Sequence, residues 1–448
     1  MKRYSVFVTC FVAIVACGGN NGNNGDDDDG NADANNGSGS GSQMGSGSNV
    51  ITGAPFVIPL LAPDGAVEFY APMLTVGGVQ FAMDLDTGST TTAIAGSTCT
   101  DCSGSDFTLT PEYTPSSTAV DQHQTADTGY SDGTGWYGEV YQDSISLENS
   151  SPSASLNVVD ISTQVDPEVM GSMAGFFEDN GYQGILGMGS PYNAEPNTGA
   201  YYQSLVQLGL PNVMAFEMCP TDGTMWLGGF DATRASAPMA YTPLDPITAY
   251  DENTGSGNPF YSVDLTGVSV DNKAITDSTG SDFALWVVDT GTSLFYPTTN
   301  VYNAALANVN ASAGLKAVFG TKAKLSDSKC LKPTTTMTDA AIDQMLPPFV
   351  MTMKNAAGGA DITVSAPALE SYLYNNGDGT YCLAMGDGQD EPTMGDEIMQ
   401  GFVVVIDQTN NQVGWAPDSG CGALPRPHDR TKRFLPPKPH HPRRVIHG

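Results

Sequence analysis

Apolar residues occur along this chain in short runs, which clusters of Gly, Asn, Asp and Ser interrupt. Three such runs follow one another at 54–60, 69–78 and 79–85, and the last alternates and ends at Asp86. Short runs with this alternation and these turn residues are typical of strands. The pattern therefore predicts a mainly-β protein, in which a strand delivers Asp86 to a turn.

The first residues show a different pattern, because Lys2 and Arg3 precede a mostly apolar stretch over 4–16. The stretch is too short to span a bilayer with ease and is typical of a secretory signal. Its end, 14–18, resembles a bacterial lipobox, so we expect 1–17 to be a signal peptide and Cys17 to carry a lipid. Ordinary cleavage that leaves Cys17 as a stray thiol is the alternative. We expect an exported protein of the bacterial cell envelope, either an outer-membrane lipoprotein or a protein of the periplasm or cell surface.

Two polar segments flank the central part of the chain. Residues 18–52 consist mostly of Gly, Asn, Asp and Ser, which predicts a disordered tether. Its acidic run at 26–29 lacks the ligand spacing of a calcium loop, so a solvated spacer is the favoured interpretation. Residues 422–448 are basic and rich in Pro, which predicts a disordered tail. The tail docks on the acidic body or on anionic lipid, caps a cleft, or is an uninvolved extension.

The charge and the cysteine content of the chain indicate which partners and which cellular compartment to expect. The 448 residues carry a formal net charge of -32, although seven of the 17 basic residues lie after residue 425. A body this acidic repels nucleic acid, so we expect no nucleic-acid partner. Six of the eight cysteines lie beyond the leader, which suits disulfides in an oxidising compartment. Cys99 and Cys102 are close enough to close a local loop. We expect neither a metal nor a cofactor.

Two short motifs repeat at a distance of about one domain. The first is Asp86-Thr87-Gly88-Ser89 and the second is Asp289-Thr290-Gly291-Thr292, each after an apolar run. This repetition suggests two related halves that face each other. Two carboxylates brought together share one proton, so that one acts as a base while the other acts as an acid. Asp86 and Asp289 are therefore the candidate catalytic residues.

These motifs resemble the pepsin family of aspartic endopeptidases over roughly 53–421. Further matches are Gly184-Ile185-Leu186-Gly187, Leu227-Gly228-Gly229 and the closing segment 404–417. The match is loosest at 395–402, which follows an additional run of acidic residues. The resemblance implies two β-barrel-like lobes, 53–229 and 230–421, with an active-site cleft between them. It also implies roles in supporting the two Asp loops: cross-lobe hydrogen bonds from Thr87 and Thr290, bonds from Ser89 and Thr292 to the carboxylates, and close packing at Gly88 and Gly291.

The segment 130–140 resembles the hairpin that closes over substrate in this family, the flap. It contains Tyr130 at the position of the flap tyrosine, a Gly-rich tip with Gly133, and Trp136. The partner of that tyrosine in pepsin is a tryptophan, but Ala93 stands at its place here. Trp136 is the replacement partner by resemblance to beta-secretase. The alternative is that Trp136 is only a cross-strand aromatic residue of the hairpin.

The same resemblance implies the remaining disulfides. Cys219 would pair with Cys421, and Cys330 with Cys382, as in beta-secretase and its relatives. Without the resemblance, the connectivity of the six cysteines stays open.

These observations together predict an aspartic endopeptidase that is active at acidic pH through a water molecule activated by the two Asp residues. Its partners would be protein or peptide substrates, its membrane contact a lipid anchor alone, and its state a monomer. A catalytically weak, peptide-binding surface lipoprotein of the same fold is the alternative. A structural adhesin on a tether would explain the leader but not the paired motifs.

Overall fold

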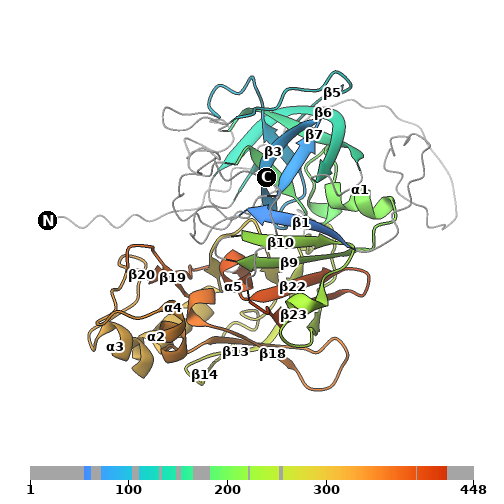
Figure 1. Cartoon of the computed structure of the whole chain (residues 1–448). Coiled ribbons are helices and arrows are strands. Elements are labelled where there is room, and N and C mark those ends of the chain that lie inside the picture. Colours follow the sequence, from blue (N-terminus) through green and yellow to red (C-terminus); the bar gives the residue numbers. More distant parts are fainter. Residues whose placement is uncertain are drawn as a thin grey trace, which may run out of the picture. The chain divides into compact units, whose positions relative to one another are not determined.

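Strand β3 (Val79–Asp86) carries the first Asp-Thr-Gly motif at its end and lies inside a seven-stranded sheet. In the computed structural model, this sheet has the strand order β2-β3-β8-β4-β7-β6-β5 (Figure 1). β3 pairs in parallel with β8 (Gly184–Gly187), so that Asp86 lies opposite Gly187. The other strands are β2 (Met73–Val76), β4 (Thr92–Ala95), β5 (Val120–Gly129), β6 (Gly135–Leu147) and β7 (Ala154–Thr163).

The structure describes residues 55–61, 72–102, 110–130, 134–147, 153–164, 182–219, 222–251, 256–389 and 391–420. All of them belong to one compact unit, Ser48–Gly448. The signal peptide, Cys17, the tether and the basic tail lie outside the described residues. So do Gly133 and Cys421.

A six-stranded antiparallel sheet joins strands from distant parts of the sequence, in the order β1-β10-β9-β22-β23-β11. Its first strand is β1 and its central strands include β22, so the beginning and the end of the described chain share one sheet. It also takes strands from both sides of the predicted lobe boundary at 229/230. The bounds are β1 (Phe56–Leu61), β9 (Val213–Cys219), β10 (Asp222–Leu227), β11 (Ala240–Pro243), β22 (Phe402–Asp407) and β23 (Gln412–Pro417).

The second Asp-Thr-Gly motif follows β15 (Trp286–Val288), which lies in a sheet of order β12-β15-β21-β16. β15 pairs in parallel with β21 (Thr393–Met394), just as β3 pairs in parallel with β8. The loosely matching segment near Gly395 therefore occupies the place of the Ile185-Leu186-Gly187 element. The remaining strands are β12 (Ser262–Val263), β13 (Leu265–Val270), β14 (Lys273–Ile275), β16 (Phe295–Tyr296), β17 (Phe349–Met353), β18 (Ile362–Ala366), β19 (Leu373–Asn375) and β20 (Tyr381–Leu383).

The helices are short and lie mostly in the second half of the sequence. Helix α2 packs on β13 and β14, and α3 packs against α2 and α4 (Figure 1). The α-helices are α1 (Tyr201–Gln207), α2 (Thr299–Ala311), α3 (Ala313–Phe319), α4 (Asp339–Met345) and α5 (Asp396–Met399), and the 3₁₀ helices are η1 (Pro191–Asn193), η2 (Ala232–Arg234) and η3 (Ala368–Glu370). None of the described helices is long and apolar enough to cross a membrane. The prediction of a mainly-β protein is confirmed.

Strand β3 is buried on both faces from Phe81 onward. Phe81, Met83 and Leu85 belong to the large apolar core, which also takes in residues of β1, β9, β15 and β22. The opposite face of the strand carries Asp84 and Asp86, both without solvent exposure. The alternation of β3 therefore separates an apolar face from a carboxyl-bearing face, and the core fixes the position of Asp86.

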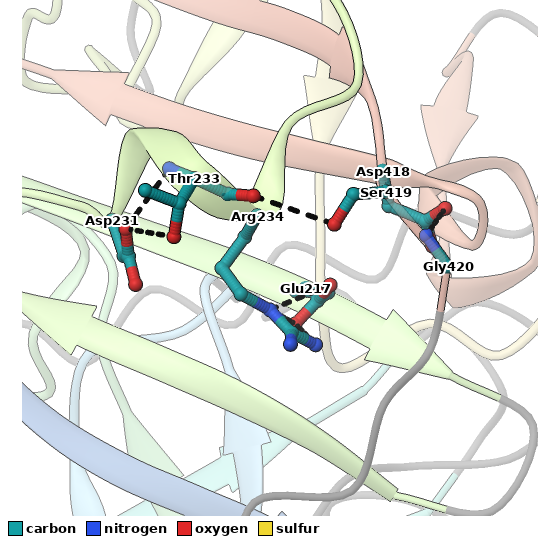
Figure 2. Close-up of polar contacts among 7 residues, drawn as sticks. All are labelled: Glu217, Asp231, Thr233, Arg234, Asp418, Ser419 and Gly420. Carbon is teal, nitrogen blue, oxygen red and sulfur yellow. Dashed lines mark hydrogen bonds and ion pairs between the residues drawn. The ribbon is translucent and has the colours of Figure 1, made fainter.

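A partly buried ion pair lies where the last strand of the described chain ends (Figure 2). The Arg234 guanidinium contacts the Glu217 carboxylate with its Nη2 at 2.6 Å and its Nε at 2.9 Å, and the Glu217 side chain is 1% exposed. Arg234 also accepts the backbone N–H of Ser419 at 2.7 Å through its carbonyl oxygen. Asp231 accepts the N–H of Thr233 and thereby caps η2. This turn ties the end of β23 to β9.

Two of the expected disulfides are present. Cys99 is bonded to Cys102, and Cys330 to Cys382. Cys219 is also disulfide-bonded, but its predicted partner Cys421 lies outside the described residues. The first two pairings are thus confirmed, and the third stays a prediction.

Candidate active site

The two motif aspartates sit on equivalent turns. Asp86 is the last residue of β3, and Asp289 directly follows β15. Neither side chain is exposed to solvent. Each turn is hydrogen-bonded to the chain at the end of its parallel partner strand. The N–H of Met188, just after β8, donates to the carbonyl of Asp86 (2.6 Å), and the N–H of Asp289 donates to the carbonyl of Met394 in β21 (3.0 Å).

Each carboxylate is held by the residues that follow it in its own motif. Asp86 Oδ1 accepts the backbone N–H of Gly88 at 2.7 Å, and Asp86 Oδ2 accepts the Ser89 hydroxyl at 2.5 Å. Asp289 repeats the arrangement, with the N–H of Gly291 at 2.9 Å on Oδ1 and the Thr292 hydroxyl at 2.6 Å on Oδ2. The two turns thus present their acids in the same way. The contacts expected for Ser89 and Thr292 are present.

Thr87 and Thr290 bind the two turns to each other across 203 sequence positions. The Thr87 hydroxyl donates to the carbonyl of Val288 (2.8 Å) and accepts the N–H of Thr290 (3.0 Å). The Thr290 hydroxyl donates to the carbonyl of Leu85 (2.7 Å) and accepts the N–H of Thr87 (3.1 Å). All four bonds are buried, so the two turns form one rigid unit.

The glycines bring the two acids into contact. A Cβ atom built on Gly88 would lie 2.6 Å from Asp289 Oδ1, and one built on Gly291 would overlap the carboxyl group of Asp86. Any larger residue at either position would displace the opposite carboxylate. Gly88 and Gly291 therefore allow each turn to approach the acid of the other.

The electrostatics of the pair favour a retained proton. Burial, and after it the negative charge of Asp289 and then of Asp84, raises the pKa of Asp86 well above its ordinary value. Among the residues that the structure describes, no Lys, Arg or His is buried. Without a neighbouring cation, burial and the charge of the other carboxylate favour the protonated form of Asp86.

The hairpin of β5 and β6 holds the predicted tyrosine and tryptophan together. The Trp136 Nε1–H donates to the Tyr130 hydroxyl at 2.8 Å, and both side chains are buried. They pack in one apolar cluster with Ala93. The bond supports the interpretation of Trp136 as the partner of Tyr130, and the small side chain of Ala93 belongs to the same cluster as the indole.

Four buried polar residues near the turns were not proposed from the sequence. Asp84 shares the face of β3 with Asp86, and the period of the strand was a usable signal for it. Asp396, at the start of α5, is fully buried, and burial followed by the charge of Asp84 raises its pKa. Ser190 and Asn193 follow β8; the Asn193 amide donates to the carbonyl of Gly88 in the first turn, and the Ser190 hydroxyl donates to the carbonyl of Pro259 in the second half of the sequence. No local pattern marks these two residues, because their partners lie far away in the sequence.

Two described groups of Cys and acidic residues are close enough to be considered as metal ligands. They are Cys99 with Asp101 and Cys102, and Cys219 with Glu217 and Asp418. The cysteines of both groups are disulfide-bonded and offer no thiolate. Neither group contacts the paired turns in the described structure.

Comparisons with known proteins agree with this geometry. A family model described as "Eukaryotic aspartyl protease" matches residues 69–418. The chain is 25% identical over 364 residues to an aspartic protease of Phaffia rhodozyma, covering 80% of this chain and 78% of that protein. It is 24% identical to rhizopuspepsin-4 of Rhizopus niveus (81% and 80% covered) and 26% identical to a beta-secretase of Strongylocentrotus purpuratus (76% and 64% covered).

Proposed function

The chain belongs to the eukaryotic aspartyl protease family, and we propose that it is an endopeptidase that hydrolyses peptide bonds at acidic pH. The observation that carries this proposal is the pair of turns. Asp86 and Asp289 each receive an N–H and a hydroxyl from their own motif, and each faces the glycine of the other. Both motifs are complete, whereas loss of either Asp or its glycine would leave only a peptide-binding surface.

In the proposed reaction, a water molecule held between the two acids attacks the scissile carbonyl. Because the pKa of Asp86 is raised, Asp86 holds the proton of the pair, and Asp289 accepts a proton from the water. The proton on Asp86 stabilises the developing oxyanion, and a proton then passes to the leaving nitrogen. Activity falls as the pH rises through the raised pKa of Asp86, because the pair then loses its shared proton.

The hairpin of β5 and β6 supports a substrate that lies extended beneath Tyr130. Ala93, Trp136, Val140 and Val159 belong to the same buried apolar cluster as Tyr130. By the family resemblance, we also propose that apolar side chains beside the cleaved bond are preferred. The Trp136 bond to the Tyr130 hydroxyl would set the position of the ring when the hairpin closes.

A fluorogenic peptide assay from acidic to neutral pH tests the proposal. Wild-type protein should cleave best in acid, whereas Asp86→Asn and Asp289→Asn should each lose cleavage while they remain folded. Asp378→Asn is the matched control, since Asp378 bonds only within an exposed turn around Thr380. Binding of a pepstatin-like mimic without cleavage of any peptide would instead support the peptide-binding alternative.

We further propose export with lipid attachment at Cys17, on the sequence of the leader and its lipobox alone. Labelled fatty acid should enter the wild-type protein and the Cys10→Ser variant but not the Cys17→Ser variant. Equal labelling of Cys17→Ser would refute lipid attachment at this residue. Cys10 is a matched control because it lies within the same leader.

A further inference from the structure

The turn at Asp86 is held by a polar side chain that lies outside the paired motifs. Asn193 is the last residue of η1 and is 1% exposed. Its Nδ2–H donates to the carbonyl oxygen of Gly88 at 2.7 Å, across 105 sequence positions. Asn is rarely buried, and burying its amide is unfavourable unless it is hydrogen-bonded. The burial of the Asn193 amide is therefore favourable only because of its hydrogen bond to Gly88, which points to a specific role for that bond.

Gly88 is the residue at which the two acids meet. Its N–H donates to Asp86 Oδ1, and its Cα faces the carboxylate of Asp289. Its carbonyl is the remaining backbone polar group, and Asn193 fixes it. A rotation of the Gly88 peptide would change both the hydrogen bond that its N–H donates to Asp86 and the distance between Gly88 and the Asp289 carboxylate.

The segment 188–195, called the clamp segment below, follows the turn along its length. Besides the Asn193 contact, its bonds to the turn are Met188 N–H to Asp86 O (2.6 Å), Gly189 N–H to Ser89 O (2.7 Å), Thr90 Oγ1–H to Ser190 O (2.5 Å) and Glu195 N–H to Thr91 Oγ1 (2.9 Å). Asn193 supplies the side-chain contact at Gly88. The hydrogen bonds from the clamp segment therefore fix the backbone conformation of the turn.

The clamp segment is itself fixed to the part of the chain that precedes β15. The Ser190 hydroxyl donates to the carbonyl of Pro259 at 2.6 Å, and the Tyr261 hydroxyl donates to the carbonyl of Met188 at 3.3 Å. Asn193 therefore extends from a segment anchored on the second half of the sequence to a turn of the first half.

We propose that Asn193 is a positioning residue for the carboxyl pair: its amide fixes the Gly88 peptide and so sets the geometry of Asp86 relative to Asp289. The proposal rests on the proposed endopeptidase function for its kinetic consequence only. A misplacement of about 1 Å in a reacting group costs on the order of 100-fold in rate. Loss of the Asn193 donor should therefore lower kcat by about 10- to 100-fold. KM should change little, because Asn193 does not hold the substrate.

Two substitutions separate positioning from mere packing. Asn193→Leu keeps the approximate volume and removes the donor at every pH. Asn193→Asp keeps the shape, and a protonated carboxyl still donates to the Gly88 carbonyl, whereas an ionised one repels it. Glu195 lies two residues further along the same segment, and Asp86 and Asp289 both contact the Gly88 residue to which Asn193 bonds. Burial and these acids should keep the introduced carboxyl protonated in acid.

The expected kinetic signature is a pH-dependent difference between the two variants. With active sites counted by titration with a pepstatin-like mimic, Asn193→Asp should approach wild-type kcat in acid and lose it progressively as the pH rises. Asn193→Leu should be impaired by a constant factor at every pH. Asn303→Asp is the control, because the Asn303 amide makes a similar bond to the carbonyl of Thr299 (2.8 Å) on an exposed face of α2. It should match the wild type.

Amide hydrogen exchange of residues 86–91, measured by mass spectrometry, tests the positioning role of Asn193 without any peptide cleavage. Asn193→Leu should accelerate exchange in this segment at every pH, and Asn193→Asp should do so only as the pH rises. If the two Asn193 variants show these changes in exchange but the wild type cleaves no peptide, the endopeptidase proposal fails while the positioning role stands. Unchanged exchange in both Asn193 variants, or unchanged kcat per titrated site in Asn193→Leu, would overturn the positioning role.

Discussion

The Thr87→Val substitution removes one hydroxyl from the junction of the two turns and replaces it with a methyl group of similar size. That hydroxyl donates to the carbonyl of Val288 at 2.8 Å and accepts the N–H of Thr290 at 3.0 Å. Both partners are buried and would be left unpaired. Each unpaired buried group costs about 1–3 kcal/mol, so the two together should lower the free energy of unfolding by about 2–6 kcal/mol.

The symmetry of the junction makes the prediction stricter. The Thr290 hydroxyl makes the mirror-image pair of bonds, to the carbonyl of Leu85 and the N–H of Thr87. Thr290→Val should therefore cost about as much as Thr87→Val. The double variant should cost less than the sum, because loosening the junction once already relaxes both turns.

Urea denaturation followed by tryptophan fluorescence measures these free energies. Thr87→Ser keeps the hydroxyl and should lose only about 0.5–1.5 kcal/mol for its missing methyl group. Thr266→Val removes an exposed hydroxyl that donates to Asp361 at 2.8 Å and should stay within about 0.5 kcal/mol of the wild type. A Thr87→Val loss no larger than that of Thr266→Val would refute the argument.

Three further results are expected. Trp136→Phe removes the hydrogen bond to the Tyr130 hydroxyl, which contributes about 0.5–1.5 kcal/mol, and should therefore lower kcat/KM by roughly 2- to 10-fold. Tyr130→Phe should lower kcat/KM little further in the Trp136→Phe background, because the bond is already lost. Fully additive effects of the two substitutions would contradict a shared bond. Burial, and after it the charge of Glu139, raises the pKa of Asp160 to about 7. Between the unfolded pKa of about 4 and that value, the folded state binds one more proton than the unfolded state, so stability falls as the pH rises. Asp160→Asn should flatten this fall and add up to about 4 kcal/mol in neutral urea titrations but nothing in acid, whereas a pH-independent effect would exclude titration of Asp160 as its cause. Arg234→Met should cost about 3–5 kcal/mol in the same assay, because the buried Glu217 carboxylate loses its ion pair with the Arg234 guanidinium. The additional exchange Glu217→Met should restore most of the loss, and a double variant as unstable as the single one would refute this account.

Short-range patterns carried the prediction of the strands and of the two turns. The alternation at 79–85 predicted β3 almost to its observed bounds, Val79–Asp86, because one face of the strand packs on the core. The hydroxyl and glycine contacts were expected from the family resemblance of the paired motifs. The hydroxyl contacts join residues within three positions of each Asp, whereas each glycine faces the acid of the other turn. The placement of Trp136 beside Tyr130 depended on a resemblance, and the observed bond supports it.

Long-range contacts set the limit of prediction from the sequence. Asn193 contacts Gly88 across 105 positions, and no local periodicity encodes such a meeting. The same holds for the pairing of β9 with β22, which joins Glu217 to Val403 in one register. Asp84 differs, because its position two residues before Asp86 in an alternating strand already placed it on the same face.

The six-stranded sheet has a consequence for the order in which the protein can be completed. β22 and β23 lie between β9 and β11, although they are translated after every other strand of that sheet. Until about residue 417 has left the ribosome, β9 and β11 therefore each lack their partner and present an open strand edge. A nascent chain must keep these edges apart from other chains throughout synthesis. Aggregation during production should accordingly depend on how long translation or export delays the last two strands, more than on the stability of the finished fold.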